Sequence, residues 1–197
     1  MTDRHAVPPE PERDEELFIE FANDLAPSGD GAAGRMAAAS ALGAWMTARH
    51  LVRRRPSALR MVGELHEFAQ LRDLVRGVVS RVAAGQQPTK TQVRSLNRVL
   101  REGVHHHVLQ PDASGATFTV GQVGDELDQA RAAVAGSLAH YLADHDRKRL
   151  RVCADDTCRW LFVDQSPAGR RRWCDMRTCG NRAKAARHRA RVRRHGK

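Results

Sequence analysis

Apolar positions recur every three or four residues along most of the chain, which is the pattern of amphipathic helices. Pro56 and Ser57 begin one such stretch, Asp125 lies near the N-cap of another, and Gly85 and Gly103 follow two of them as helix stops. In the first stretch the run "LFIEF" would also suit a strand. The pattern predicts helices over residues 15–27, 35–52, 57–85 and 89–102, and a long one from about residue 125 onward.

The period changes from helical to alternating in two places. The segment "VHHHVLQPDASGATFTV" has two β-like runs around a Pro- and Gly-containing turn, which predicts a hairpin. Further on, "RWLFVD" is a strand pattern, "SPAG" is a turn and "RRRWC" returns the chain, so a second hairpin is expected with Trp160, Phe162 and Trp173 inside it. The predicted fold class is mainly α, with a small C-terminal β-hairpin/α module.

Charge divides the 197-residue chain into unequal parts. Residues 147–197 carry 17 Lys and Arg against 4 Asp and Glu, whereas residues 1–146 carry 16 against 19. We therefore expect a helical regulatory or sensor domain over residues 15–146 and a basic module over residues 147–197. Residues 1–14 are rich in Pro and charge, and are expected to be disordered. The basic module points to an acidic polymer or surface as partner.

No apolar run is long enough for a membrane span, and the first residues lack the apolar stretch of a signal peptide. The expected location is cytoplasmic, with no membrane partner. In a reducing compartment, cysteines serve as metal ligands more often than as disulfides.

The four cysteines form two close pairs with matching spacing. Cys153 and Cys158 are separated by four residues, and so are Cys174 and Cys179, with fifteen residues between the pairs. Paired thiols around a short insert are typical of a tetrahedral zinc site, so one Zn²⁺ ion is predicted. Two disulfides, or four unrelated thiols, are the alternatives. With all four positions taken by thiolates, no water remains for activation, so the site would be structural.

A helical segment, "GNRAKAARHRARVRR", follows Cys179 directly. Its N-terminal amides and dipole would face the negative charge of a four-thiolate zinc site. This ending predicts a treble-clef-like module.

The stretch "RRWCDMRTCGNRAKAARHRAR" resembles the CGNR-type zinc finger, named for Cys179 to Arg182, and "RVCADDTCRWLFVDQS" fits the same family. The likeness covers residues 151–192. The body is similar to the helical stress-induced transcription regulator domain, also called ABATE, through "FIEFANDLA", where relatives tend to read "LDFVNT". There Glu20 stands at the acidic position and Asp24 replaces the threonine. Over residues 30–150 the likeness lies in helix order. The resemblance implies a DNA-binding bacterial regulator.

The last helix combines small and basic side chains. Ala183, Ala186 and Ala190 fall on one face, which is expected to pack on the second hairpin. Arginine grips phosphates with two hydrogen bonds and can read guanine edges, which favours duplex DNA as partner. A solvated tail, or loose binding to RNA or ribosomes, is the alternative. The candidate nucleic-acid-binding residues are Arg170, Arg171, Arg172, Arg182, Lys184, Arg187, Arg189, Arg191, Arg193 and Arg194.

The chain has no Gly-rich phosphate loop, nucleophile elbow or HExxH motif, so an enzyme is not expected. Asp164 is expected to pair with an arginine such as Arg172. The favoured function is a transcription regulator whose zinc finger binds DNA and whose helical domain senses a small molecule or forms a homodimer. The alternatives are a zinc-stabilised RNA- or protein-binding adaptor, and an enzyme whose site the sequence does not reveal.

Overall fold

The computed structural model describes residues 16–24, 32–104, 106–111, 114 and 118–195. The expected disorder of residues 1–14 lies outside these ranges. The described elements are α1 (Leu17–Asp24), α2 (Ala32–Ala48), α3 (Ala58–Ala83), α4 (Lys90–Glu102), β1 (His106–Pro111), β2 (Phe118–Val123), α5 (Glu126–Asp144), the 3₁₀ turn η1 (Arg147–Arg149), β3 (Leu150–Val152), β4 (Leu161–Val163), the π-helical turn η2 (Met176–Gly180) and α6 (Asn181–His195). The mainly α prediction is confirmed.

Side-chain caps explain where three helices begin. Ser57 accepts a hydrogen bond from the Arg60 N–H at the start of α3, and Asp125 accepts one from the Leu127 N–H at the start of α5. At α4, Thr89 and Gln92 form a reciprocal capping box. These caps satisfy N–H groups that have no partner within the helix.

Left-handed backbone marks two helix ends. Gly85, with φ 74°, follows α3 at the predicted stop. The second helix was expected to run to residue 52, but α2 ends at Ala48 because His50 adopts φ 54° and turns the chain out of the helix.

One apolar core joins the helical body to the base of the C-terminal module. Phe18 and Phe21 of α1 and Phe68 of α3 are fully buried at its centre. Leu150 of β3 and Leu161 of β4 are also fully buried and belong to the same cluster. A small second cluster surrounds the cysteines. The module therefore sits on α1 and α3 through its two strands.

The two hairpin predictions have different outcomes. β1 and β2 pair antiparallel, with Val108 opposite Gly121, as predicted. The second hairpin prediction named the wrong partner strand. β4 pairs antiparallel with β3, which precedes Cys153, and the segment after the "SPAG" turn forms no strand. That returning segment contributes one backbone bond, from the Ala154 N–H to the Arg172 carbonyl (2.8 Å). The loop with the first cysteine pair therefore connects the two strands.

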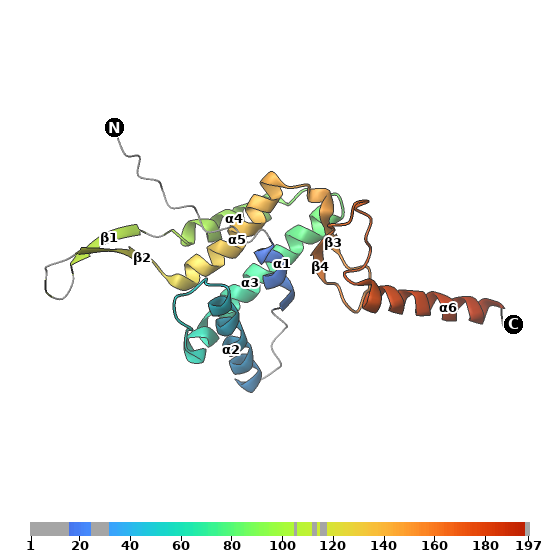
Figure 1. Cartoon of the computed structure of the whole chain (residues 1–197), viewed down its shortest axis with the longest axis horizontal. Helices are drawn as coiled ribbons and strands as arrows, with labels where there is room; N and C mark the ends of the chain where they lie inside the picture. Colours follow the sequence, from blue (N-terminus) through green and yellow to red (C-terminus); the bar gives the residue numbers. More distant parts are fainter. Residues whose placement is uncertain (1–15, 25–31, 105, 112–113, 115–117, 196–197) are drawn as a thin grey trace.

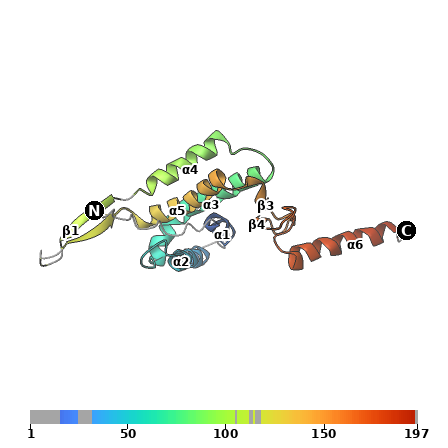
Figure 2. The ribbon, with the colours of Figure 1, turned by 45° about the horizontal axis from the view of Figure 1, so that its top comes forward.

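The elements are spread along one long axis (Figure 1). The β1–β2 hairpin extends from one end of the helical body, and α6 projects from the other end, beyond the module that carries it. Figure 2 shows the same arrangement after rotation, with α6 separate from α1 to α5. Most of α6 is therefore free to meet a partner.

Candidate metal centre and nucleic-acid interface

The four predicted ligands come from separate short segments that the fold brings together. Cys153 follows β3, Cys158 ends the loop toward β4, Cys174 lies before η2, and Cys179 lies within η2. Asp155 shapes the first loop: one carboxylate oxygen accepts hydrogen bonds from the Thr157 N–H (3.0 Å) and hydroxyl (2.6 Å). The Asp155 carbonyl also accepts from the Cys158 N–H (2.9 Å), so this turn places the second thiol.

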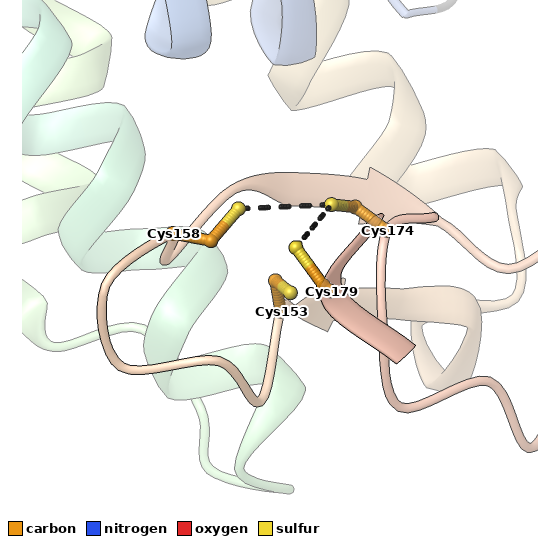
Figure 3. Close-up of side chains that lie close together, drawn as sticks. All are labelled: Cys153, Cys158, Cys174 and Cys179. Atoms are coloured by element: carbon orange, nitrogen blue, oxygen red, sulfur yellow. Dashed lines mark hydrogen bonds between the residues drawn. The ribbon is translucent and has the colours of Figure 1, made fainter. Parts of the chain in front are cut away.

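The sulfur geometry fits a single tetrahedral ion (Figure 3). All four Sγ atoms lie within 4.8 Å of one another, with 3.7 Å between Cys158 and Cys174 and 3.8 Å between Cys174 and Cys179. A tetrahedron with Zn–S bonds of about 2.3 Å has S···S edges of about 3.8 Å. All four cysteines are free thiols, which removes the disulfide alternative.

The pKa values of the clustered cysteine thiols indicate that the site needs a positive charge to hold them as thiolates. Burial and the neighbouring thiols raise the pKa of Cys174 far above its ordinary value, and they raise the pKa of Cys179 as well. For Cys153, burial also acts to raise the pKa, but hydrogen bonds from Cys174 and Asp155 outweigh it and the pKa is lowered. Four clustered thiols cannot all ionise without compensation, and a bound Zn²⁺ supplies the charge that holds them as thiolates. The site carries one structural zinc ion.

The residues after Cys179 brace the metal loop. A Cβ added to Gly180 would lie 2.9 Å from the sulfur of the exposed Met176 side chain, so a larger residue there would displace the end of this flexible side chain. The Asn181 amide donates to the Arg177 carbonyl (2.9 Å), which lies one turn earlier. Arg182 donates from Nε to an Asp155 carboxylate oxygen (2.8 Å) and from a terminal nitrogen to the Cys179 sulfur (3.0 Å). The motif thus ties the second ligand pair to the first loop.

The Asp164 side chain stabilises the turn that follows β4. Its side chain is fully buried, and it accepts from the Ser166 N–H (3.0 Å), the Ser166 hydroxyl (2.6 Å) and the Arg171 N–H (2.7 Å). Burial acts to raise its pKa, but these hydrogen bonds outweigh burial and the pKa is lowered. The expected pairing with Arg172 was wrong, because that side chain lies over Trp173. Two backbone N–H groups and the Ser166 hydroxyl satisfy the carboxylate instead, and the nearby charge of Arg151 also lowers its pKa.

Asn23 joins the helical body to the module through paired hydrogen bonds. Its amide donates to the Leu161 carbonyl (2.8 Å), and its oxygen accepts from the Leu161 N–H (2.9 Å), so it occupies the edge of β4 as another strand would. Nearby, Arg76 of α3 donates to the Ala22 carbonyl (3.1 Å) and the Arg159 carbonyl (2.8 Å). Sequence reasoning did not assign these contacts, although Asn23 lies inside the segment that carried the family resemblance.

Some of the predicted nucleic-acid-binding residues contact other parts of the module, and most of them are exposed to solvent. Arg182 is held as described, and Arg171 lies over the Phe162 ring (5.1 Å) and donates to the Cys174 carbonyl. Arg172 and Arg187 both lie over the Trp173 ring, at 5.2 and 5.9 Å. Seven predicted residues are exposed: Arg170, Arg172, Arg182, Lys184, Arg187, Arg189 and Arg191. Arg193 and Arg194 lie on α6. For all ten predicted residues, contact with nucleic acid stays a prediction.

Two packing expectations for the module need correction. The alanine face was expected to pack on the hairpin, but Ala183 is half-buried and Ala186 is exposed, because α6 projects outward. The Ala190 side chain lies outside what the structure describes. Trp160 was expected inside the hairpin, yet it is 42% exposed; it precedes β4, and the buried residues there are Leu161 and Phe162. Phe162 is buried and Trp173 half-buried, as predicted.

The helical body contains small cavities that bear on the expected effector. One of 220 Å³ lies between the α2–α3 connection and the start of α5, lined by His50, Val52, Arg53 and Glu126 among others. This volume is below the range of about 300–1,000 Å³ that is usual for drug-sized ligands. The small-molecule effector and the homodimer stay predictions.

Comparison with known proteins supports both halves of this description. The CGNR zinc finger family matches residues 149–192. A second family, described as "Putative stress-induced transcription regulator" and abbreviated ABATE, matches residues 15–145. A search of the curated proteins found no match. In the part of the chain that the structure describes, no helix has the length and apolarity to cross a membrane. The second match covers about two thirds of the sequence, and it shows that the chain belongs to the ABATE transcription-regulator family, with a CGNR zinc finger in its C-terminal part.

Proposed function

We propose that this protein is a cytoplasmic transcription regulator that binds duplex DNA through α6, with the zinc centre as the platform that aims this helix. The carrying observation is the combination of charge and exposure on α6. The helix has no acidic residue, and Lys184, Arg187, Arg189 and Arg191 are exposed on it. A strongly cationic helix projecting from its domain matches the polyanionic surface of DNA in charge.

The helical body would supply ligand sensing or dimerisation, and the protein would act by binding and not by catalysis. The cluster of titratable cysteines is consistent with this role, because four thiolates fill the coordination of zinc and leave no position for a substrate. Hydrogen bonds from Asn23 and Arg76 to the module give the body a direct mechanical link to the finger.

The test compares the zinc-loaded protein on duplex DNA and on RNA of the same sequence, by fluorescence anisotropy at several salt concentrations. The variant Lys184→Gln/Arg189→Gln/Arg191→Gln removes three charges from α6. A matched control, Arg94→Gln/Arg98→Gln/Arg101→Gln, removes three exposed charges from α4. We expect the α6 variant alone to weaken DNA binding by about tenfold or more at 0.15 M salt, and to reduce the slope of log K against log salt by about 2–3.

Undetectable duplex binding at low salt, or equal losses in both variants, would contradict the proposal. Tighter binding to RNA would favour the second candidate, a zinc-stabilised RNA-binding adaptor. The observation behind that candidate is the exposed ring of Trp160, because RNA-binding proteins stack unpaired bases on such rings.

A further inference from the structure

The two sides of α6 differ in what they contact near the zinc centre. Arg182 bonds to Asp155 and Cys179, Ala183 is half-buried, and Arg187 lies over Trp173. Successive residues turn by about 100° around an α-helix, so these three positions fall within an arc of about 140°. This arc faces the zinc platform.

A second side of the helix adjoins this arc at Ala185, which lines a cavity together with Asp155 and Thr157 of the first zinc loop. Relative to Arg182, His188 lies at about 240° and Val192 at about 280°, with Ala185 beside them at about 300°. All three are exposed, and Val192 is 55% exposed. We call these three exposed positions the Ala185–His188–Val192 strip.

Cations border the strip on both sides. Lys184 and Arg191 lie at about 200° and 180° on one flank, and Arg189 lies at about 340° on the other. All three cations are exposed. An uncharged strip between two cationic flanks suits a helix lying in a groove, because the flanks can reach both phosphate backbones while the strip meets the floor.

The chemistry of the strip suits base edges. The major groove of B-DNA is about 12 Å wide and admits an α-helix. A histidine ring can exchange hydrogen bonds with purine acceptors and donors, and valine methyl groups can contact the thymine methyl. The seven steps from Ala185 to Val192 span about 10.5 Å along the helix, which is the rise of about three base pairs.

We propose that α6 lies in the major groove with the Ala185–His188–Val192 strip against the base edges, and that His188 and Val192 set a sequence preference over about three consecutive base pairs. This inference rests on the proposed binding of duplex DNA. It adds the groove, the orientation of the helix and the two residues that read sequence.

The experiment selects fragments from a random duplex library with the zinc-loaded full chain, sequences them, and repeats the selection with His188→Ala/Val192→Ala. A matched control, His66→Ala/Val93→Ala, removes an exposed histidine and an exposed valine from α3 and α4. Zinc content and circular dichroism verify that each variant is folded. We expect wild type and control to enrich the same short motif, and the α6 variant to lose or change it at about three positions. The affinity of that variant for random duplex DNA should stay within about twofold, with an unchanged salt slope, since its phosphate contacts remain.

The outcomes separate the two proposals. Enrichment of the same motif by the α6 variant would overturn the assignment of His188 and Val192, and DNA binding would stand. Duplex binding without any enriched motif would overturn sequence reading by this strip and leave general DNA binding intact. Failure of the wild-type protein to bind duplex DNA would overturn both.

Discussion

Asn23→Ala should destabilise the folded protein more than most substitutions at half-buried polar positions do. The wild-type amide makes both hydrogen bonds to the backbone of Leu161, at 2.8 and 2.9 Å, and Leu161 is fully buried. Alanine would leave a buried N–H and a buried carbonyl without these partners. Each orphaned group costs about 1–3 kcal/mol, and part of the site can admit water, so we expect a loss of about 2–4 kcal/mol.

The assay is urea unfolding followed by circular dichroism at fixed free zinc, with Asn97→Ala as the matched control. Asn97 is exposed on α4, so its replacement should change the free energy of unfolding by less than about 0.5 kcal/mol. A chelator-competition measurement should also show faster zinc loss from Asn23→Ala, because β4 leads out of the loop that carries the first ligand pair. If Asn23→Ala and Asn97→Ala unfold at the same urea concentration, the reasoning is refuted.

Three further changes test other parts of the structure. Cys174→Ser should lower zinc from about one ion per chain to near zero by metal analysis and unfold the C-terminal module; a folded chain without zinc would contradict the structural role. Gly103→Ala should lower the melting temperature markedly, because the new Cβ would lie 2.0 Å from the Ala132 Cβ, whereas Gly63→Ala, which meets nothing within 4 Å in mid-helix, should stabilise by about 0.5–1 kcal/mol. Asp164 has a lowered pKa in the folded state, so its contribution should be complete above the ordinary carboxyl pKa and decline as the pH falls through the folded value. The stability difference between wild type and Asp164→Asn, from urea unfolding at several pH values, should therefore shrink toward acid, and a constant difference would rule this out.

The sequence predicted what is local or regularly spaced. Helical periodicity and boundary residues such as Ser57, Gly85 and Asp125 located the helices, because these signals act within a few residues. The zinc ligands were predictable from their paired spacing and from the expected reducing compartment, because a four-thiolate site needs two short loops and a returning chain. The charge asymmetry likewise located the projecting basic helix.

Long-range pairing and short strands were beyond sequence reasoning. β3 has three residues, one of them Arg151, so it carries almost no alternating pattern and its pairing with β4 was missed. Asn23 and Leu161 are 138 residues apart, and no local signal links them. Arg182 looked like any other basic residue of α6, and only the folded loop shows that Asp155 and Cys179 hold it.

The shared core also bears on how such a protein can change over evolutionary time. Leu150 and Leu161 lie in the finger segment but are buried among side chains of the helical body. If the finger were transferred to another protein, these two leucines would be exposed to water, which costs about 1.5–3 kcal/mol of folding free energy each. The helical body that remained would have a cavity in its core. The two halves are therefore expected to be inherited together and to vary in concert at this contact, while the projecting face of α6 is free to diversify.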